Sequence, residues 1–370
     1  MKILVVHPRL SVLGGAEQVA IHSLRAIVEN GHQASLISER FDVATLENFL
    51  GCQGVLGKVD RLSFPVFNPF VRKGLLLYQQ LYYFQRETRR ILRDHRDFDL
   101  VLSTQDIGYV PSTNTRTIQY CYFPDYFAHV RDGQVSFWWN LYYSPARTYY
   151  HERVRHVNDF LSVSDYTGRF IRKVWGREST TLYPPCPIEQ YRSSGEDKKE
   201  NLVITIGRIV PEKRMHDFLE IASGSPSFRF AIIGAVDGKN LQYYKSLKKK
   251  ASSNVSFILS PLRGAKDVLR RGKVYVHCAR NEQFGIAIVE AMAAGCVPVV
   301  HESGGPPEIV TGDVGFTWKN TDEAISHIAN LFAHDSLRVE LSKRALNRAA
   351  QFGSDAFESK ILETLKKSVG

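Results

Sequence analysis

The stretch KILVVHP (residues 2–8) is a continuous apolar run of strand length, and it decides the interpretation of the first half of the chain. A glycine turn follows it, and apolar residues then recur at helical spacing between Ala16 and Asn30. HQASLISER (32–40) has the pattern of a second strand. A strand, a helix and a strand in this order predict a parallel, doubly wound sheet.

The same alternation continues through all 370 residues, a length that favours two domains. Further strands are predicted at 99–104, 117–122, 159–164, 201–208, 228–234, 255–260, 273–279 and 297–302. The charged, serine-rich stretch 193–200 has no periodicity and predicts a linker. We predict an α/β protein with two Rossmann-like domains, 1–190 and 191–353, that face each other across a cleft. An amphipathic helix pattern within 354–370 is expected to pack back toward the first domain.

The composition favours a folded, soluble chain, because 44% of the residues are hydrophobic and 23% are charged. The five cysteines form no C-x-x-C pair, which argues against a disulfide framework or a zinc site. The start resembles neither a signal peptide nor a membrane span, so we expect a cytoplasmic protein. A net charge of +10 favours anionic partners. Nucleic acid is a weaker alternative, because no concentrated basic arm or recognised motif is present.

The strongest chemical pattern is NEQFGIAIVEAMAAG (281–295), a loop that leads into a helix. Glu282 lies in the loop and Glu290 lies two turns into the helix. Amides near Phe284, Gly285 and Ile286 form a helix N-terminus, which binds phosphate groups. Carboxylates suit the hydroxyls of a sugar or a ribose. The alternative for either glutamate alone is an ordinary helix-capping role.

This E-x7-E pattern, followed by AMAAG (291–295), PVV (298–300) and SGGPPEIV (303–310), resembles the donor site of the family 4 retaining glycosyltransferases. The resemblance covers essentially the full chain and implies the GT-B fold of that family, with a nucleotide-sugar donor as partner. It also implies that Glu282 contacts the donor sugar and that Glu290 contacts the ribose.

GRIVPEK (207–213) resembles the diphosphate clamp of the same family. The resemblance implies that Arg208 and Lys213 hold the donor diphosphate, and two cations suffice for this without a metal ion. GGAE (14–17) resembles the family's first glycine turn, which places Gly14 and Gly15 beside the donor phosphates and the acceptor. Solvated surface cations and a plain tight turn are the alternatives. No third glycine completes the motif of a dinucleotide-dependent oxidoreductase.

Several details, among them YPPC (183–186) and HESGGP (301–306), resemble the mannosyltransferases that extend lipid-linked oligosaccharides with α-1,2-mannose on the cytosolic face of the endoplasmic reticulum. The resemblance implies a hexosyltransferase that uses GDP-mannose, acts on a lipid-linked or other glycan acceptor and needs no metal cofactor. Two alternatives stay open. One is a UDP-sugar-dependent enzyme of the same fold, and the other is a non-catalytic module that binds a nucleotide sugar.

The chain departs from the family pattern at one place. These enzymes carry His-Tyr-Pro at the end of a central strand, where this chain has Tyr122, Phe123, Pro124 and Asp125. The role of that histidine near the sugar falls to Tyr122 or Asp125, or is unnecessary. A core tyrosine and a turn aspartate are the structural alternatives.

Two stretches, 64–96 and 137–155, combine many aromatic residues with a basic excess. Such amphipathic segments suit an anionic membrane surface or a lipid pyrophosphate acceptor. Ordinary interdomain packing is the alternative.

Overall fold

The computed structural model folds as two compact units, Met1–Pro185 with Phe357–Gly370, and Cys186–Ala356. It describes residues 1–11, 14–71, 75–95, 97–124, 137–192, 199–259 and 266–369. The boundary between the units lies five residues before the predicted one at 190. Most of the predicted linker lies outside the described residues, as do Leu13 and Asp125.

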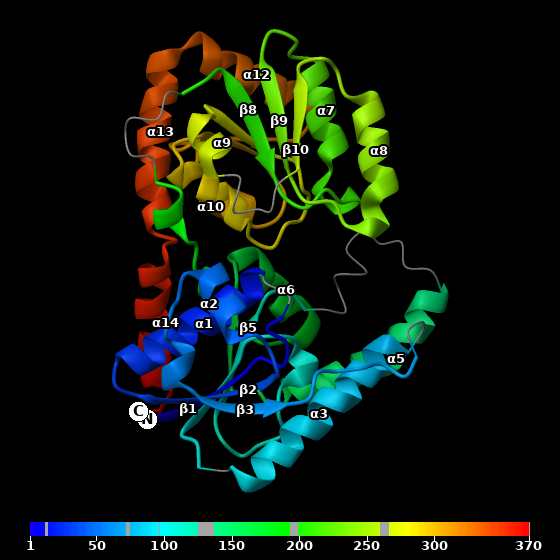
Figure 1. Cartoon of the computed structure of the whole chain (residues 1–370), viewed down its shortest axis with the longest axis vertical. Coiled ribbons are helices and arrows are strands. Elements are labelled where there is room, and N and C mark those ends of the chain that lie inside the picture. The colour runs from blue at the N-terminus through cyan, green and yellow to red at the C-terminus, as the bar shows by residue number, and fades with distance from the viewer. Residues whose placement is uncertain are drawn as a thin grey trace. The chain divides into compact units, whose positions relative to one another are not determined.

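The first unit contains a seven-stranded sheet with the order β3-β2-β1-β4-β5-β6-β7. Figure 1 labels its strands β1, β2, β3 and β5. Every neighbouring pair is parallel. The strands are β1 (Lys2–Val6), β2 (Gln33–Glu39), β3 (Asp60–Phe64), β4 (Leu100–Ser103), β5 (Thr117–Cys121), β6 (Asp159–Ser162) and β7 (Thr180–Thr181).

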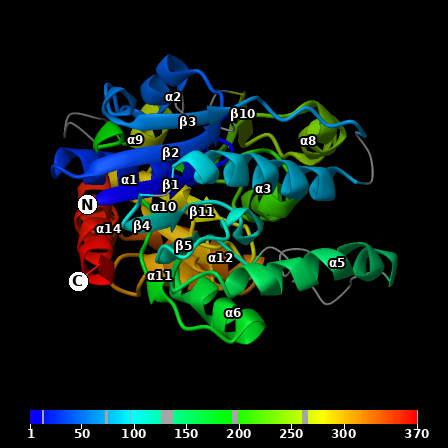
Figure 2. The same ribbon diagram turned by 90° about the horizontal axis from the view of Figure 1, so that it is seen from below.

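The helices of the first unit connect these strands, and α3 and α5 run beside each other at one side of the sheet (Figure 2). They are α1 (Gly15–Glu29), α2 (Val43–Leu50), α3 (Leu76–Asp94), α5 (Phe137–Val154) and α6 (Asp165–Trp175). The last helix, α14 (Ser354–Val369), joins this unit from Phe357 onward. Within the described ranges, no helix is long and apolar enough to cross a bilayer.

The second unit contains a six-stranded parallel sheet with the order β10-β9-β8-β11-β12-β13. Its strands are β8 (Leu202–Ile206), β9 (Arg229–Gly234), β10 (Val255–Leu259), β11 (Val274–His277), β12 (Val297–His301) and β13 (Phe316–Trp318). Its helices are α7 (Met215–Ser223), α8 (Leu241–Lys250), α9 (Lys266–Arg271), α10 (Ile286–Ala293), α11 (Pro306–Ile309), α12 (Thr321–Ala333) and α13 (Asp335–Ala350).

Both sheets are covered on two faces, which explains the continuous apolar runs of their central strands. Ile3 to Val6 of β1 and Val274 to Val276 of β11 have no exposed surface. The predicted α/β class and all ten predicted strands are confirmed. The strand order reverses between β1 and β4 and between β8 and β11, and ligands of such sheets bind at the carboxyl ends of the strands at this switch point.

A buried ion-pair cluster attaches α14 to α1. Glu358 on α14 accepts a hydrogen bond of 2.6 Å from Nδ1 of His22 and pairs with Nε of Arg25 at 2.9 Å. Burial lowers the pKa of His22, but the Cys52 thiol and Glu358 outweigh burial and raise it above the ordinary value. The Glu358 carboxylate therefore compensates two cationic side chains at a position that is largely shielded from solvent.

Replacing Glu358 with alanine should lower the free energy of unfolding by about 3 kcal/mol, because it leaves the partners of a buried pair uncompensated. Glu363 lies on the same helix in an exposed pair with Lys367, so Glu363→Ala should cost less than about 0.5 kcal/mol. Urea unfolding measures both changes, and equal losses would contradict this role of Glu358.

The loss should also depend on pH. A histidine with a raised folded pKa stabilises the fold fully below its unfolded pKa, and this contribution is lost as the pH rises through the folded pKa. The difference between the wild type and Glu358→Ala should therefore narrow toward alkaline pH.

Candidate active site

Three loops leave the carboxyl ends of strands β8, β11 and β12 in the second unit. They carry the predicted motifs at 207–213, 281–285 and 303–305. Because these strands are neighbours and parallel, the loops meet at one edge of the sheet. An isolated bridge between Glu282 and Gly304 joins two of them directly.

Glu282 lies at the centre of this edge and is held by two basic side chains. Its Oε2 forms an ion pair with Nζ of Lys213 and lies 3.7 Å from Nε2 of His277. Burial opposes its ionisation, but Lys213 and His277 outweigh burial and hold the pKa of Glu282 well below its ordinary value. Burial lowers the pKa of His277, so this ring stays neutral near pH 7. The site thus presents a fixed carboxylate whose side chain is only 18% exposed.

Arg208 follows β8 in the same loop as Lys213 and is exposed. Within the part of the chain that the structure describes, its guanidinium has no hydrogen-bond or ion-pair partner. A planar guanidinium without a carboxylate partner suits the oxygens of a phosphate. Of the two predicted phosphate ligands, Lys213 is therefore engaged with Glu282 and Arg208 is available.

The two glycines after β12 are needed for the backbone beneath Glu282. Gly304 has a φ of 86°, and a Cβ there would lie 2.4 Å from the carbonyl oxygen of Glu282. The N–H of Gly305 donates a 2.8 Å hydrogen bond to that same carbonyl. On the other side of the loop, the N–H of Asn281 donates to Oγ of Ser303 at 2.9 Å. The SGG sequence thus fixes the position of the Glu282 backbone.

The loop then turns into α10 at Gly285, which has a φ of 110°. The N–H groups of Ile286 and Ala287 have no acceptor within the helix and can serve an anion, whereas the N–H of Ile288 donates to the Gly285 carbonyl at 2.9 Å. The Phe284 side chain is buried and packs edge-to-face on Phe352, with ring centroids 5.6 Å apart. Only the backbone of Phe284 can therefore contact a ligand.

Glu290 lies two turns further along α10 in a different electrostatic environment. Burial raises its pKa to about 7, against the opposing effects of a hydrogen bond from Tyr191 and the charge of Lys266. Lys266 is itself held by a 2.9 Å hydrogen bond to Oε1 of Gln190. The two glutamates of the motif thus differ in charge near neutral pH.

A second buried carboxylate connects two loops of the candidate site. Asp217 at the start of α7 accepts two hydrogen bonds from Arg214, of 2.7 Å and 2.9 Å. It also lies 3.8 Å from the guanidinium of Arg280, which directly precedes Asn281. Asp217 therefore links the loop after β8 to the loop after β11.

In the first unit, the glycine turn lies at the carboxyl end of β1. Gly14 is the N-cap of α1, and its N–H donates a 2.8 Å hydrogen bond to Oε2 of Glu17. Glu17 is buried beside His7, whose Nδ1 lies 2.9 Å from the Thr104 hydroxyl. The Gly14 amide is therefore used within the turn, whereas Gly15 is partly exposed at the first position of the helix.

Tyr122 follows β5 at the same edge, and its hydroxyl is engaged by backbone. Its single O–H is shared between the carbonyls of Ala16, at 3.2 Å, and Thr104, at 3.1 Å. Burial raises the pKa of Tyr122 well above its ordinary value. These contacts are those of a core tyrosine that joins α1 to the loop after β4.

Residues 188–350 match the family Glycosyl transferases group 1. The chain carries a group 1 glycosyltransferase domain. The matched range contains both glutamates of the E-x7-E motif and both cations of the predicted clamp.

Several curated relatives of this chain carry the name GDP-Man:Man(3)GlcNAc(2)-PP-Dol alpha-1,2-mannosyltransferase. The human protein is 27% identical over 55% of this chain and 47% of its own length. The Dictyostelium discoideum protein is 26% identical over 54% of this chain and 45% of its length. The chain thus matches about half the length of these relatives.

Solved structures share the fold of the whole chain. HepE from Anabaena in complex with UDP has a TM-score of 0.77 and 17% identity, covering 99% of this chain and 100% of that chain. Sucrose-phosphate synthase from Thermosynechococcus elongatus also has a TM-score of 0.77, with 12% identity, covering 99% and 98% of the two chains. The predicted GT-B fold is confirmed.

The sequence did not single out several residues of the site in this group 1 domain. His277 was missed because the last residue of a buried strand is usually part of the core. Its position at the carboxyl end of β11, before Glu282, was the available signal. Asp217 and Ser303 act through the loops, and their partners are distant in sequence or on another strand.

Gly304→Ala should lower the free energy of unfolding by more than about 2 kcal/mol, because a side chain there combines a positive φ with a backbone clash. Gly312 offers a matched control, since a Cβ there would meet no atom within 4 Å. Gly312→Ala should change the free energy of unfolding by less than about 1 kcal/mol. Thermal unfolding of both variants checks the difference, and equal stability would show that the loop is not packed as described.

Glu290 should make the stability depend on pH. Its folded pKa lies above the value near 4.5 expected for the unfolded chain, so the folded state binds more protons and stability falls as the pH rises from about 4.5 to about 7. Glu290→Gln should remove at most about 3 kcal/mol of this decline. Unfolding curves across this range test it. An unchanged slope in the variant would rule out the burial of Glu290.

Proposed function

We propose that the chain transfers mannose from GDP-mannose, with retention, to a hydroxyl of a lipid-linked glycan. The observation that carries this proposal is the Glu282 carboxylate, kept ionised by Lys213 and His277 next to the available Arg208. The donor and acceptor classes follow the printed names of the relatives.

Each residue has a distinct role in the proposed donor site. Arg208 and Lys213 bind the diphosphate and stabilise its negative charge as it departs. Glu282 accepts hydrogen bonds from the sugar hydroxyls, and Glu290 binds the ribose. The backbone amides from Phe284 to Ile286 add the partial positive charge of a helix N-terminus. We propose that the two cations take the part that a metal ion plays in other transferases.

The proposed reaction needs no nucleophile from the protein. The bond from the anomeric carbon to the diphosphate oxygen breaks, and a bond from that carbon to the acceptor oxygen forms on the same face of the sugar. The acceptor proton passes to the departing diphosphate. Lys213 exchanges part of its contact with Glu282 for the diphosphate when the donor binds.

We further propose that the chain acts at a membrane on the cytosolic side, where a lipid-linked acceptor is held. Large apolar side chains at the starts of α3 and α5 are exposed, including Phe137 and Trp138 at 73% and 74%. Exposed aromatic residues beside arginines suit the interface of an anionic membrane.

A UDP-sugar is the second candidate donor. Structures that share the fold hold UDP, UDP with glucose, and UDP-glucose. Competition of each nucleotide against radiolabelled donor distinguishes the two candidates, because the true donor base should compete at much lower concentration.

Glu282→Ala should reduce transfer of radiolabelled mannose from GDP-mannose to extracted lipid-linked glycans by about 100-fold or more, the usual loss when a preorganised charged contact is removed. Glu302→Ala is the matched control. Glu302 directly precedes the SGG sequence, and its carboxylate forms an exposed ion pair with Lys319. The control should stay within about twofold of the wild type. Unchanged turnover in Glu282→Ala would remove this residue from the catalytic set.

A further inference from the structure

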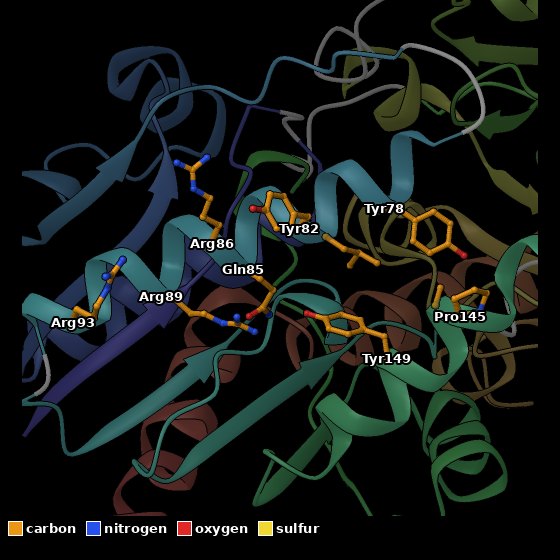
Figure 3. Close-up of a pocket in the computed structure, with 10 residues that line it drawn as sticks. Tyr78, Tyr82, Gln85, Arg86, Arg89, Arg93, Pro145 and Tyr149 are labelled. Atoms are coloured by element: carbon orange, nitrogen blue, oxygen red, sulfur yellow. The ribbon is translucent and has the colours of Figure 1, made fainter.

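A cavity of about 460 Å³ lies between α3 and α5 in the first unit (Figure 3). Its wall contains aromatic and apolar side chains of both helices, including Tyr78, Leu81 and Tyr149. Tyr78 packs edge-to-face on Tyr142, with centroids 5.5 Å apart, and donates a hydrogen bond to its carbonyl. This contact holds the two helices together at one end of the cavity.

The lining of the cavity is strongly cationic. Arg86, Arg89 and Arg93 recur at three- and four-residue spacing on α3, and no carboxylate is among the described residues that line the cavity. Arg89 is exposed, and no carboxylate of the described chain pairs with it. The nearby Glu87 is buried, pairs with Arg90 at 2.9 Å and lies 4.0 Å from Nε of Arg86, so it balances part of the charge of Arg86 but not that of Arg89. The arginine row therefore favours an anionic ligand.

A buried acceptor atom adds a second feature. Gln85 is 4% exposed, and its Nε2 donates to the carbonyls of Gly108 at 2.8 Å and Val110 at 2.9 Å. These two acceptors fix the orientation of the amide, and its Oε1 has no partner among the described residues. The Tyr149 hydroxyl also donates to Gly108, at 3.1 Å. The cavity thus offers arginines for a phosphate and a free amide oxygen for a hydroxyl group.

The ends of the two helices beyond Tyr78 and Tyr142 form an apolar rim. Its large side chains are exposed to solvent and gather at the starts of α3 and α5: Leu75, Leu76, Phe137, Trp138, Trp139 and Leu141. Exposed apolar side chains gathered in this way favour binding of a membrane or another apolar partner. An apolar rim next to a cationic cavity matches an amphiphile with an anionic head.

The end of the cavity that carries the arginines points away from the residues expected near the acceptor. Arg89 and Arg93 also line a second cavity of about 650 Å³ with His95 and the segment 112–115. That segment precedes β5, so this cavity lies at the amino edge of the sheet, whereas Gly14 and Tyr122 lie at the carboxyl edge. A ligand held by Arg89 is therefore remote from the residues expected near the acceptor hydroxyl.

We infer that the cavity between α3 and α5 binds the phosphate head group of an anionic glycerophospholipid that is not a substrate. The arginines contact the phosphate, Gln85 accepts a head-group hydroxyl, and the acyl chains lie against the apolar rim. This lipid holds the first unit at the membrane surface. The inference does not depend on which nucleotide sugar the second unit uses.

Arg89→Gln tests the site through binding of the full chain to vesicles of phosphatidylcholine, with and without phosphatidylglycerol. It should weaken binding to the anionic vesicles about fivefold, the effect expected of one arginine at an anionic surface. Arg172→Gln removes the same charge from α6, where Arg172 pairs with Glu178 at the surface, and should weaken binding less than about twofold. Glycerol phosphate should compete with the anionic vesicles for the wild type.

A second variant tests the rim. Trp138→Ser should weaken binding to both kinds of vesicle, because Trp138 is 74% exposed and its burial in the interface is apolar. Equal losses of vesicle binding for Arg89→Gln and Arg172→Gln would mean that binding depends only on the net charge of the protein. This result would overturn the proposed site. No vesicle binding by the wild type, or tight binding of glycerol phosphate without any vesicle binding, would also overturn it. Protection by GDP should be the same in all these variants, which separates this test from the proposed transferase function.

Discussion

The ion pair between Lys213 and Glu282 is the interaction on which the organisation of the second unit's site depends. It joins the loop after β8 to the loop after β11, and these strands are neighbours at the switch point of the sheet. Burial alone would raise the pKa of a carboxylate at this mostly buried position and favour its protonated form. Lys213 and His277 reverse that preference, and Gly304 lets the backbone beneath Glu282 approach closely.

The first unit has the same strand arrangement, but its buried charged groups have a different role. Glu17, His7 and Thr104 meet where β1 and β4 end, and Tyr122 adds a hydroxyl from the end of β5. These groups bond to one another and to backbone, so they make the turn rigid. The exposed arginines and apolar side chains of this unit lie instead on α3 and α5. The charged side chains proposed to bind the donor and those proposed to bind the lipid thus lie on different elements.

The central strands could be predicted because strands buried on both faces are continuous apolar runs, as in KILVV and LVITI. The edge strands β3, β7 and β13 were missed, and β7 has only two residues. β3 (DRLSF) is mostly exposed and polar, and β13 is three residues long. Motif resemblance located Glu282 and Lys213, but no local pattern predicts that residues 69 positions apart form an ion pair. Phe284 shows the reverse case, since its motif position suggested ligand contact while its side chain packs on Phe352.

The central claim is that the second unit binds a guanine nucleotide sugar around Glu282. Thermal unfolding of the full chain with GDP, GDP-mannose, UDP and UDP-glucose tests this most directly, because a ligand that binds only the folded state stabilises it by about 2.7 kcal/mol at 100 times its dissociation constant. The account predicts a rise in Tm with GDP and GDP-mannose that far exceeds the rise with the uracil nucleotides. A larger rise with UDP, or no rise with any nucleotide, would contradict it.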